Sequence, residues 1–166
     1  MMRTAKMIGT ALSAVLVCGA ATHAVADDGA TREPIYPAGI KPIAPYSPAI
    51  QTDSLLFVSG QIPYVDGAIP EHASDGTDDV KDQTKIVMDN IVKVLEEAGL
   101  TLENALMVNV YLTDLSGYGA FNEVYGPYWT DKGWTPPARA AVEVGALPGS
   151  KPGAPVLVEV SVIAGR

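Results

Sequence analysis

The sequence predicts a single α+β or α/β domain in which helices pack on one face of a β-sheet. Two observations carry this prediction. Apolar residues recur with helical spacing in two segments, and in four others they form short runs or alternate with polar residues. The predicted order is strand, helix, strand, helix, strand, strand, which is typical of a sheet with helices on one side. A chain of 166 residues with 48% hydrophobic content is sufficient for one such domain.

The first half of the predicted domain contains one strand and the most regular helix. Residues 55–60 form a short apolar run that ends at a glycine, which is typical of a strand. Residues 62–77 are rich in Gly, Pro and Asp and are predicted as a loop. From Asp78 the spacing becomes helical, and Gly99 suits a C-terminal cap. The apolar face of this helix is Val80, Val87, Ile91, Val94, Leu95 and Ala98.

The second half contains a further helix and three strands. Residues 105–112 alternate in the manner of a buried strand, and residues 116–132 have a second helical pattern. The pair Gly126-Pro127 should kink that helix. Residues 138–147 and 156–164 are predicted as the last two strands, and neither an internal repeat nor a second domain is indicated.

The first 26 residues have the layout of a secretory signal peptide. Arg3 and Lys6 form a short positive region, residues 7–21 are apolar, and Ala24-Val25-Ala26 is a small-x-small cleavage site. We therefore expect cleavage after Ala26 and a periplasmic or secreted protein without membrane contact. The alternative is a retained anchor, but the apolar run falls short of the roughly 18 to 20 residues of a spanning helix. Residues 27–42 are predicted as a flexible lead-in, and residues 43–166 as the domain.

Removal of this leader limits the chemistry that is open to the chain. Cys18 lies inside it, so the mature chain has no cysteine for a disulfide, a metal thiolate or a nucleophile. In a lipoprotein Cys18 would instead be the acylated first residue, although Val17 is bulkier than such a site prefers. His72 is the one histidine of the mature chain, which argues against a metal site and against a serine–histidine pair.

The mature chain is strongly acidic. Cleavage removes two of the eleven basic residues and none of the nineteen acidic ones, so the net charge becomes −10. Such a surface repels nucleic acids and anionic membranes, and a nuclease function is disfavoured for the same reason. A protein of this charge that binds a small anion needs a locally placed cation.

Arg139 is the candidate for that cation, because it is the one arginine between Lys41 and Lys151 and lies near the start of a largely apolar strand. A guanidinium is a permanent planar cation, and its partial burial is costly unless an anion faces it. Either a carboxylate of this chain pairs with it, for which Glu143 and Glu159 are candidates, or it receives the carboxylate of a substrate. Both interpretations remain open on composition alone.

Six short motifs follow one another along the domain. They are Tyr46-Ser47-Pro48-Ala49, Phe57-Val58-Ser59-Gly60-Gln61-Ile62-Pro63, Met88-Asp89-Asn90-Ile91, Asn122-Glu123-Val124-Tyr125, Pro137-Ala138-Arg139-Ala140 and Val158-Glu159-Val160-Ser161-Val162-Ile163-Ala164. In order and spacing they resemble the reactive intermediate deaminase family, also called Rid or YjgF-like. The resemblance implies a chorismate-mutase-like α+β fold, with a mixed sheet and two helices on one face. It also implies a homotrimer with clefts between subunits.

The resemblance further implies an activity and a set of site residues. The reaction of the arginine-bearing branch is hydrolysis of enamine or imine acids, such as 2-aminoacrylate or 2-iminopropionate, to 2-keto acids and ammonia. By position, Arg139 matches the residue that grips the substrate carboxylate, and Glu159 matches the one associated with the attacking water. Tyr46, Ser59 and Asn122 match residues that line or adjoin the cleft. No cofactor is expected, because an imine carbon is already electrophilic.

Two features depart from the better-known members. Ala141 stands where they carry a cysteine two residues after the arginine, which bears on substrate preference and redox sensitivity. Export would separate the chain from cytosolic sources of aminoacrylate. The expected substrate is therefore a small carboxylate-bearing imine, released by an amine- or amino-acid-oxidising enzyme outside the inner membrane. The alternative is a ligand-binding or chaperone-like member that uses the same clefts without turnover.

Overall fold

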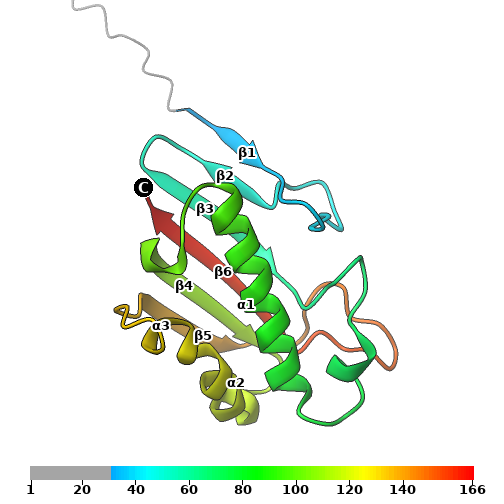
Figure 1. The fold of residues 1–166 in the computed structure, drawn as a ribbon. Coiled ribbons are helices and arrows are strands. Elements are labelled where there is room, and N and C mark those ends of the chain that lie inside the picture. Colours follow the sequence, from blue (N-terminus) through cyan, green and yellow to red (C-terminus); the bar gives the residue numbers. More distant parts are fainter. Residues whose placement is uncertain (1–30) are drawn as a thin grey trace, which may run out of the picture.

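Residues 31–166, the part that the computed structural model describes, form a six-stranded mixed sheet with helices on one face (Figure 1). The strand order is β1-β2-β3-β6-β4-β5, and β4–β5 is the one parallel pair among these strands. The last strand of the chain therefore lies in the middle of the sheet. The strands are β1 (Glu33–Ile35), β2 (Ala49–Gln51), β3 (Leu55–Gln61), β4 (Ala105–Leu112), β5 (Ala138–Glu143) and β6 (Val158–Gly165).

The helices α1 (Asp79–Glu97), α2 (Tyr118–Tyr125) and α3 (Pro127–Thr130) cover one face of this sheet (Figure 1). Short 3₁₀ turns are η1 (Glu71–Ala73), η2 (Leu102–Asn104) and η3 (Leu115–Gly117). The predicted α+β class, with a mixed sheet and helices on a single face, is confirmed. In residues 31–166 no helix has both the length and the apolar character that a membrane span requires. The predicted signal peptide lies outside the described residues.

The helix α1 matches its sequence pattern closely. Val87, Ile91, Val94 and Leu95 of its apolar stripe are fully buried against the sheet, and Val80 and Ala98 at its ends are partly buried. Gly99 follows the helix end with a φ of 72°, the left-handed conformation that a side chain would disfavour. The predicted periodicity and its terminal glycine are both confirmed.

The second predicted helix is interrupted rather than kinked. Residues 116–132 form the turn η3 and two separate helices, α2 and α3, which meet at Gly126. Pro127 opens α3 as its first residue, because a proline has no N–H to continue the helix from α2. The predicted strand 138–147 is also shorter in the structure, since β5 ends at Glu143.

The sheet begins earlier in the chain than the sequence pattern indicates. β1 lies within residues 27–42, the segment predicted as a flexible lead-in, and it pairs antiparallel with β2. Each of these strands has three residues, and Pro34 lies in the middle of β1. Strands this short do not show an alternating pattern, and a proline is tolerated on an edge strand.

The two faces of the sheet differ in what they carry. Along β6, Val158, Val160 and Val162 are buried under the helices, whereas Glu159 and Ser161 alternate with them and are half-buried on the helix-free face. We call this second side of the sheet the open face. The same alternation runs along β4, so every site residue on a strand can be assigned to one face.

Candidate functional site

The structure divides the five residues predicted from the sequence into two groups. Arg139 and Asn122 contact each other on the helix side of the sheet, whereas Tyr46, Ser59 and Glu159 line one pocket. Glu159 points to the open face, because it alternates with the buried valines of β6. A single chain therefore does not bring the guanidinium and the Glu159 carboxylate to the same side.

Arg139 is held by two hydrogen bonds from its terminal nitrogens to α2. Its Nη1 donates to Oδ1 of Asn122 at 2.9 Å, and its Nη2 donates to the hydroxyl oxygen of Tyr118 at 2.6 Å. The amide nitrogen of Asn122 donates to the backbone carbonyl of Tyr118 at 2.9 Å, so the amide oxygen faces the arginine. Residues 118 and 122 are one helical turn apart, and α2 therefore offers both acceptors side by side.

Three aromatic rings of α2 surround the same guanidinium. Its Cζ atom lies 5.4 Å from the ring centre of Tyr118, 5.7 Å from that of Phe121 and 4.6 Å from that of Tyr125. Such contacts attract a cation and displace water from it. We call Arg139, Asn122 and these three aromatic residues the arginine cage.

No carboxylate within residues 31–166 forms an ion pair with Arg139. Glu143, on the same strand, accepts instead from the backbone N–H of Leu115 at 2.9 Å. Glu123, next to Asn122, pairs with Lys81 at 2.7 Å. The intramolecular salt bridge that the sequence left open is thus not formed here, and the cage keeps its positive charge.

Tyr125 carries no negative charge that could neutralise Arg139. Its hydroxyl is buried and has no hydrogen-bond partner among the described residues. Burial raises the pKa of Tyr125 to about 12, against a smaller opposite effect of the Arg139 charge. The phenol is therefore neutral at physiological pH.

Tyr46, Ser59 and Glu159 lie around a pocket of about 300 Å³ at the open face. Ser59 donates its hydroxyl proton to the backbone carbonyl of Ser47 at 2.7 Å, which leaves the hydroxyl oxygen free to accept. We call this the Glu159 pocket; its other lining residues are Ile43, Ala44, Gly60, Ile62 and Pro148. Apolar walls around a few polar groups are typical of a small-molecule site.

The carboxylate of Glu159 occupies space that a side chain at position 60 would take. A Cβ atom on Gly60 would lie 1.9 Å from Oε1 of Glu159. The pairing of β3 with β6 shifts register between Val58 and Gln61, so the strand bulges at this glycine. Burial raises the pKa of Glu159 above the ordinary value of a glutamate, and a carboxylate of raised pKa is a better proton acceptor.

The chain is similar to known proteins of one family. Residues 37–165 match the family described as Endoribonuclease L-PSP. A RutC family protein of Pyrococcus abyssi is 46% identical over 124 residues, which is 75% of this chain and 88% of that protein. The chain belongs to the Rid/YjgF-like family.

Solved structures of the Rid family share the fold. The crystal structure of E. coli TdcF with bound serine is 31% identical, with a TM-score of 0.70 over 81% of this chain and 98% of TdcF. The E. coli YjgF gene product is 29% identical, with a TM-score of 0.69 over 81% of this chain and 98% of that one. The chorismate-mutase-like fold that the motifs implied is therefore confirmed.

Sequence reasoning assigned no role in the site of this Rid protein to the aromatic residues of α2 or to Gly60. Tyr118, Phe121 and Tyr125 all surround Arg139. The spacing of four residues between Tyr118 and Asn122 could have indicated a shared partner. Gly60 belongs to a quoted motif, but its role as space for Glu159 depends on the pairing of β3 with β6.

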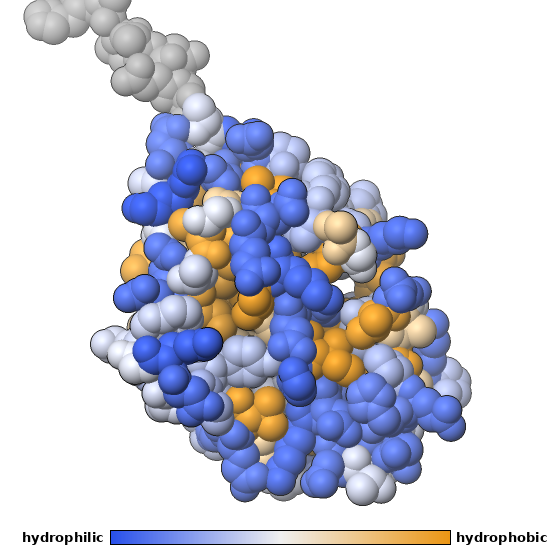
Figure 2. Space-filling view, in the orientation of Figure 1, coloured by the Kyte–Doolittle hydropathy of each residue, from blue (hydrophilic) through white to orange (hydrophobic). Residues whose placement is uncertain are grey.

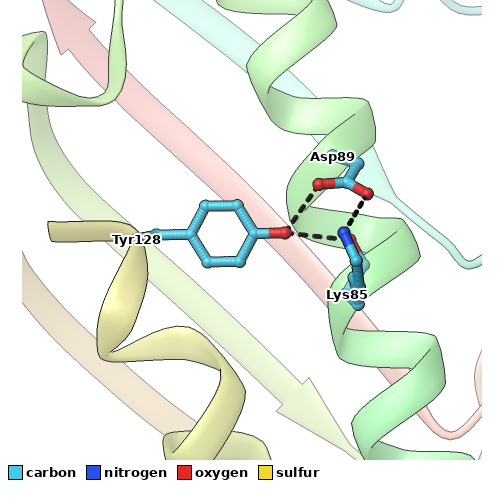
Figure 3. A network of polar contacts seen from close by, with 3 residues as sticks. All are labelled: Lys85, Asp89 and Tyr128. Carbon is cyan, nitrogen blue, oxygen red and sulfur yellow. Dashed lines mark hydrogen bonds and ion pairs between the residues drawn. The ribbon is translucent and has the colours of Figure 1, made fainter. Parts of the chain in front are cut away.

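A larger groove of about 680 Å³ lies between α1 and α3 and contains none of the predicted site residues. On this face, hydrophilic residues run along α1 and hydrophobic ones show on either side (Figure 2). Asp89 accepts from Lys85 at 2.8 Å and from the hydroxyl of Tyr128 at 2.6 Å, which ties α3 to α1 (Figure 3). Burial and the Asp89 carboxylate raise the pKa of Tyr128. The polar groups of this network satisfy one another and stabilise the helix layer.

Within residues 31–166, no group of three or more His, Cys, Asp or Glu side chains is placed to hold a metal ion.

Proposed function

We propose that this Rid-family protein is a hydrolytic deaminase of small enamine or imine acids, which it converts to 2-keto acids and ammonia. The observation that carries the proposal is Arg139, a partly buried cation with fixed geometry and no carboxylate partner in the described chain. A planar guanidinium in this state suits the planar carboxylate of a ligand. TdcF, which was crystallised with bound serine, supports a ligand of the amino-acid class.

We infer that the active unit is a homotrimer, in which the arginine cage of one protomer meets the Glu159 pocket of another. The two groups lie on opposite faces of the sheet in one chain, and a second copy can bring them together. Apolar side chains exposed on the open face support this inference. Phe57 is 42% exposed and Val142 is 46% exposed, and an interface between copies would bury both.

The reaction then needs positioning and one proton acceptor. Arg139 fixes the substrate carboxylate and with it the plane of the C=N bond. Glu159 takes a proton from a water molecule as the water oxygen adds to C2, and returns a proton to the nitrogen. The C–N bond of the resulting carbinolamine breaks, and ammonia and the 2-keto acid leave. Water and imine supply every atom, so the step needs neither a cofactor nor a metal.

The description of the matched family as an endoribonuclease offers RNA as another substrate class. The net charge of −8 and the single caged cation favour a small anion instead.

We further propose that the protein is exported and acts on imines that oxidising enzymes release outside the inner membrane. The leader layout supports this proposal. The measurement is the N-terminal sequence of the protein isolated from a periplasmic fraction. Export predicts a chain that begins at Asp27, whereas an intact leader on protein found only in the cytosol would overturn it.

The test of catalysis is an assay in which an amino-acid oxidase generates the imine. Residues 27–166 should accelerate 2-keto acid formation, and Arg139→Ala should lose roughly a thousandfold in kcat/KM. Glu97→Gln, an exposed change on α1, is the control and should match the wild type. Full activity of Arg139→Ala would contradict the mechanism. Binding of the keto acid without acceleration would instead indicate a ligand-binding member of the family.

A further inference from the structure

The hydroxyl of Tyr118 accepts a hydrogen bond from Arg139 and keeps its own proton free. It accepts from Nη2 of Arg139 at 2.6 Å, and no residue within 31–166 accepts its proton. Tyr118 is half-buried. A phenol can accept one hydrogen bond and donate another at the same time.

The other contacts of Arg139 differ from Tyr118. Asn122 turns its oxygen to the guanidinium and donates one of its two amide N–H groups to the backbone carbonyl of Tyr118. The hydroxyl of Tyr125 is fully buried, so a ligand does not reach it. Phe121 contributes only a ring face.

The position of the Tyr118 hydroxyl matches that of a second donor to an anion on Arg139. Two of the five guanidinium N–H groups are engaged by α2, which leaves three for a ligand. The two N–H bonds of Nη2 diverge, so an anion oxygen on the remaining hydrogen lies about 4 to 5 Å from the Tyr118 oxygen, which is 2.6 Å from the same nitrogen. The second oxygen of a carboxylate bound there can lie between the two. The free phenol proton then has an acceptor within reach.

We propose that Tyr118 is a substrate-binding residue that forms, together with Arg139, a carboxylate site of two side chains. Its oxygen accepts from the guanidinium, and its proton is donated to the substrate carboxylate. The neutral phenol adds a donor without adding charge, so the site remains matched to a single carboxylate. This inference rests on the proposed function only in that the ligand carries a carboxylate.

The experiment compares Tyr118→Phe with wild type and with Tyr128→Phe. The control removes a hydroxyl from the same helix layer, at a site away from Arg139. The probe is pyruvate, the 2-keto acid product, with binding measured by calorimetry and thermal midpoints recorded for each protein. Tyr118→Phe should weaken pyruvate binding about tenfold, while Tyr128→Phe leaves it unchanged. In the imine assay Tyr118→Phe should raise KM by the same factor and change kcat less than about twofold.

A neutral probe separates direct contact from mere support of the cage. Pyruvamide lacks the carboxylate, so its binding should be equal in wild type and Tyr118→Phe. Equal pyruvate affinity in the two proteins, equal weakening for pyruvate and pyruvamide, or no pyruvate binding by wild type would each overturn the inference. Selective loss of pyruvate binding by Tyr118→Phe, in a protein that accelerates no imine hydrolysis, would retain it and reject the proposed deaminase.

Discussion

The arginine cage and the Glu159 pocket differ in how many contacts hold their charged side chain. The cage fixes Arg139 with two hydrogen bonds and three rings, all from the single helix α2. Glu159 forms no hydrogen bond or ion pair within residues 31–166. Its carboxylate fits where it does because Gly60 has no side chain to occupy that space. A group that must orient a ligand benefits from rigidity, whereas a group that must take a proton benefits from a raised pKa. The difference fits the proposed roles, which are ligand binding at the arginine cage and proton transfer at Glu159.

The largest expected effect comes from mixing two inactive variants. If each site combines Arg139 of one protomer with Glu159 of another, co-expression of Arg139→Ala with Glu159→Gln restores intact sites. Random assembly gives about a quarter of the wild-type activity from two chains that alone have almost none. The measurement is the rate of keto-acid formation by the co-purified mixture, beside each variant expressed alone. No recovery would show that both residues act within one chain.

The next effect concerns the proton acceptor. Glu159→Gln keeps the shape of the side chain but cannot take a proton, so kcat should fall roughly a hundredfold with little change in KM. Steady-state kinetics of the imine assay measure both constants, and Glu97→Gln is again the control. An equal rise in KM without a fall in kcat would assign Glu159 to binding instead.

A smaller effect is expected from a substitution that moves the Glu159 carboxylate without replacing it. Gly60→Ala places a methyl group where the carboxylate lies, so Glu159 should move and kcat should fall about tenfold. The clash is with the end of a flexible side chain, and the free energy of unfolding should change by less than about 1 kcal/mol. Chemical denaturation beside the kinetic assay tests both parts. A large loss of stability with normal kcat in the remaining folded protein would contradict this account.

The smallest effect is the pH dependence of stability. Because burial raises the pKa of Glu159, the folded state favours its protonated form, and this contribution is lost as pH rises through the folded pKa. Glu159→Gln should therefore melt at the same temperature as wild type at pH 4 and about 2 °C higher at pH 7. Thermal melts across this range check the sign. A lower midpoint for the variant at pH 7 would indicate an ionic partner for Glu159.

Local patterns were sufficient for much of the fold. The helix α1 could be predicted because its apolar spacing and Gly99 are properties of adjacent residues. The short strands β1 and β2 could not, because strands of three residues carry too few positions for a pattern. The break at Gly126 was expected only as a kink, since the sequence shows that Pro127 lacks an N–H but not how far the chain turns there.

The sequence names Arg139 and Glu159 as candidates, but it does not show how they are arranged. Arg139 and Glu159 were singled out because a charge on an apolar strand requires a partner. Whether they pair depends on which face each occupies, and this follows from the register of β4, β5 and β6. Tyr118 escaped notice because a tyrosine at helical spacing has the same pattern as a core residue.

The central position of β6 has a consequence for how the protein is made. This strand is the last of the six in sequence order, yet it lies between β3 and β4 and carries Glu159 (Figure 1). Both neighbouring strands are therefore synthesised before the strand that joins them. The arginine cage comes from a continuous stretch between residues 118 and 139, which is available earlier. The segment that holds Arg139 is therefore synthesised before the strand that carries Glu159.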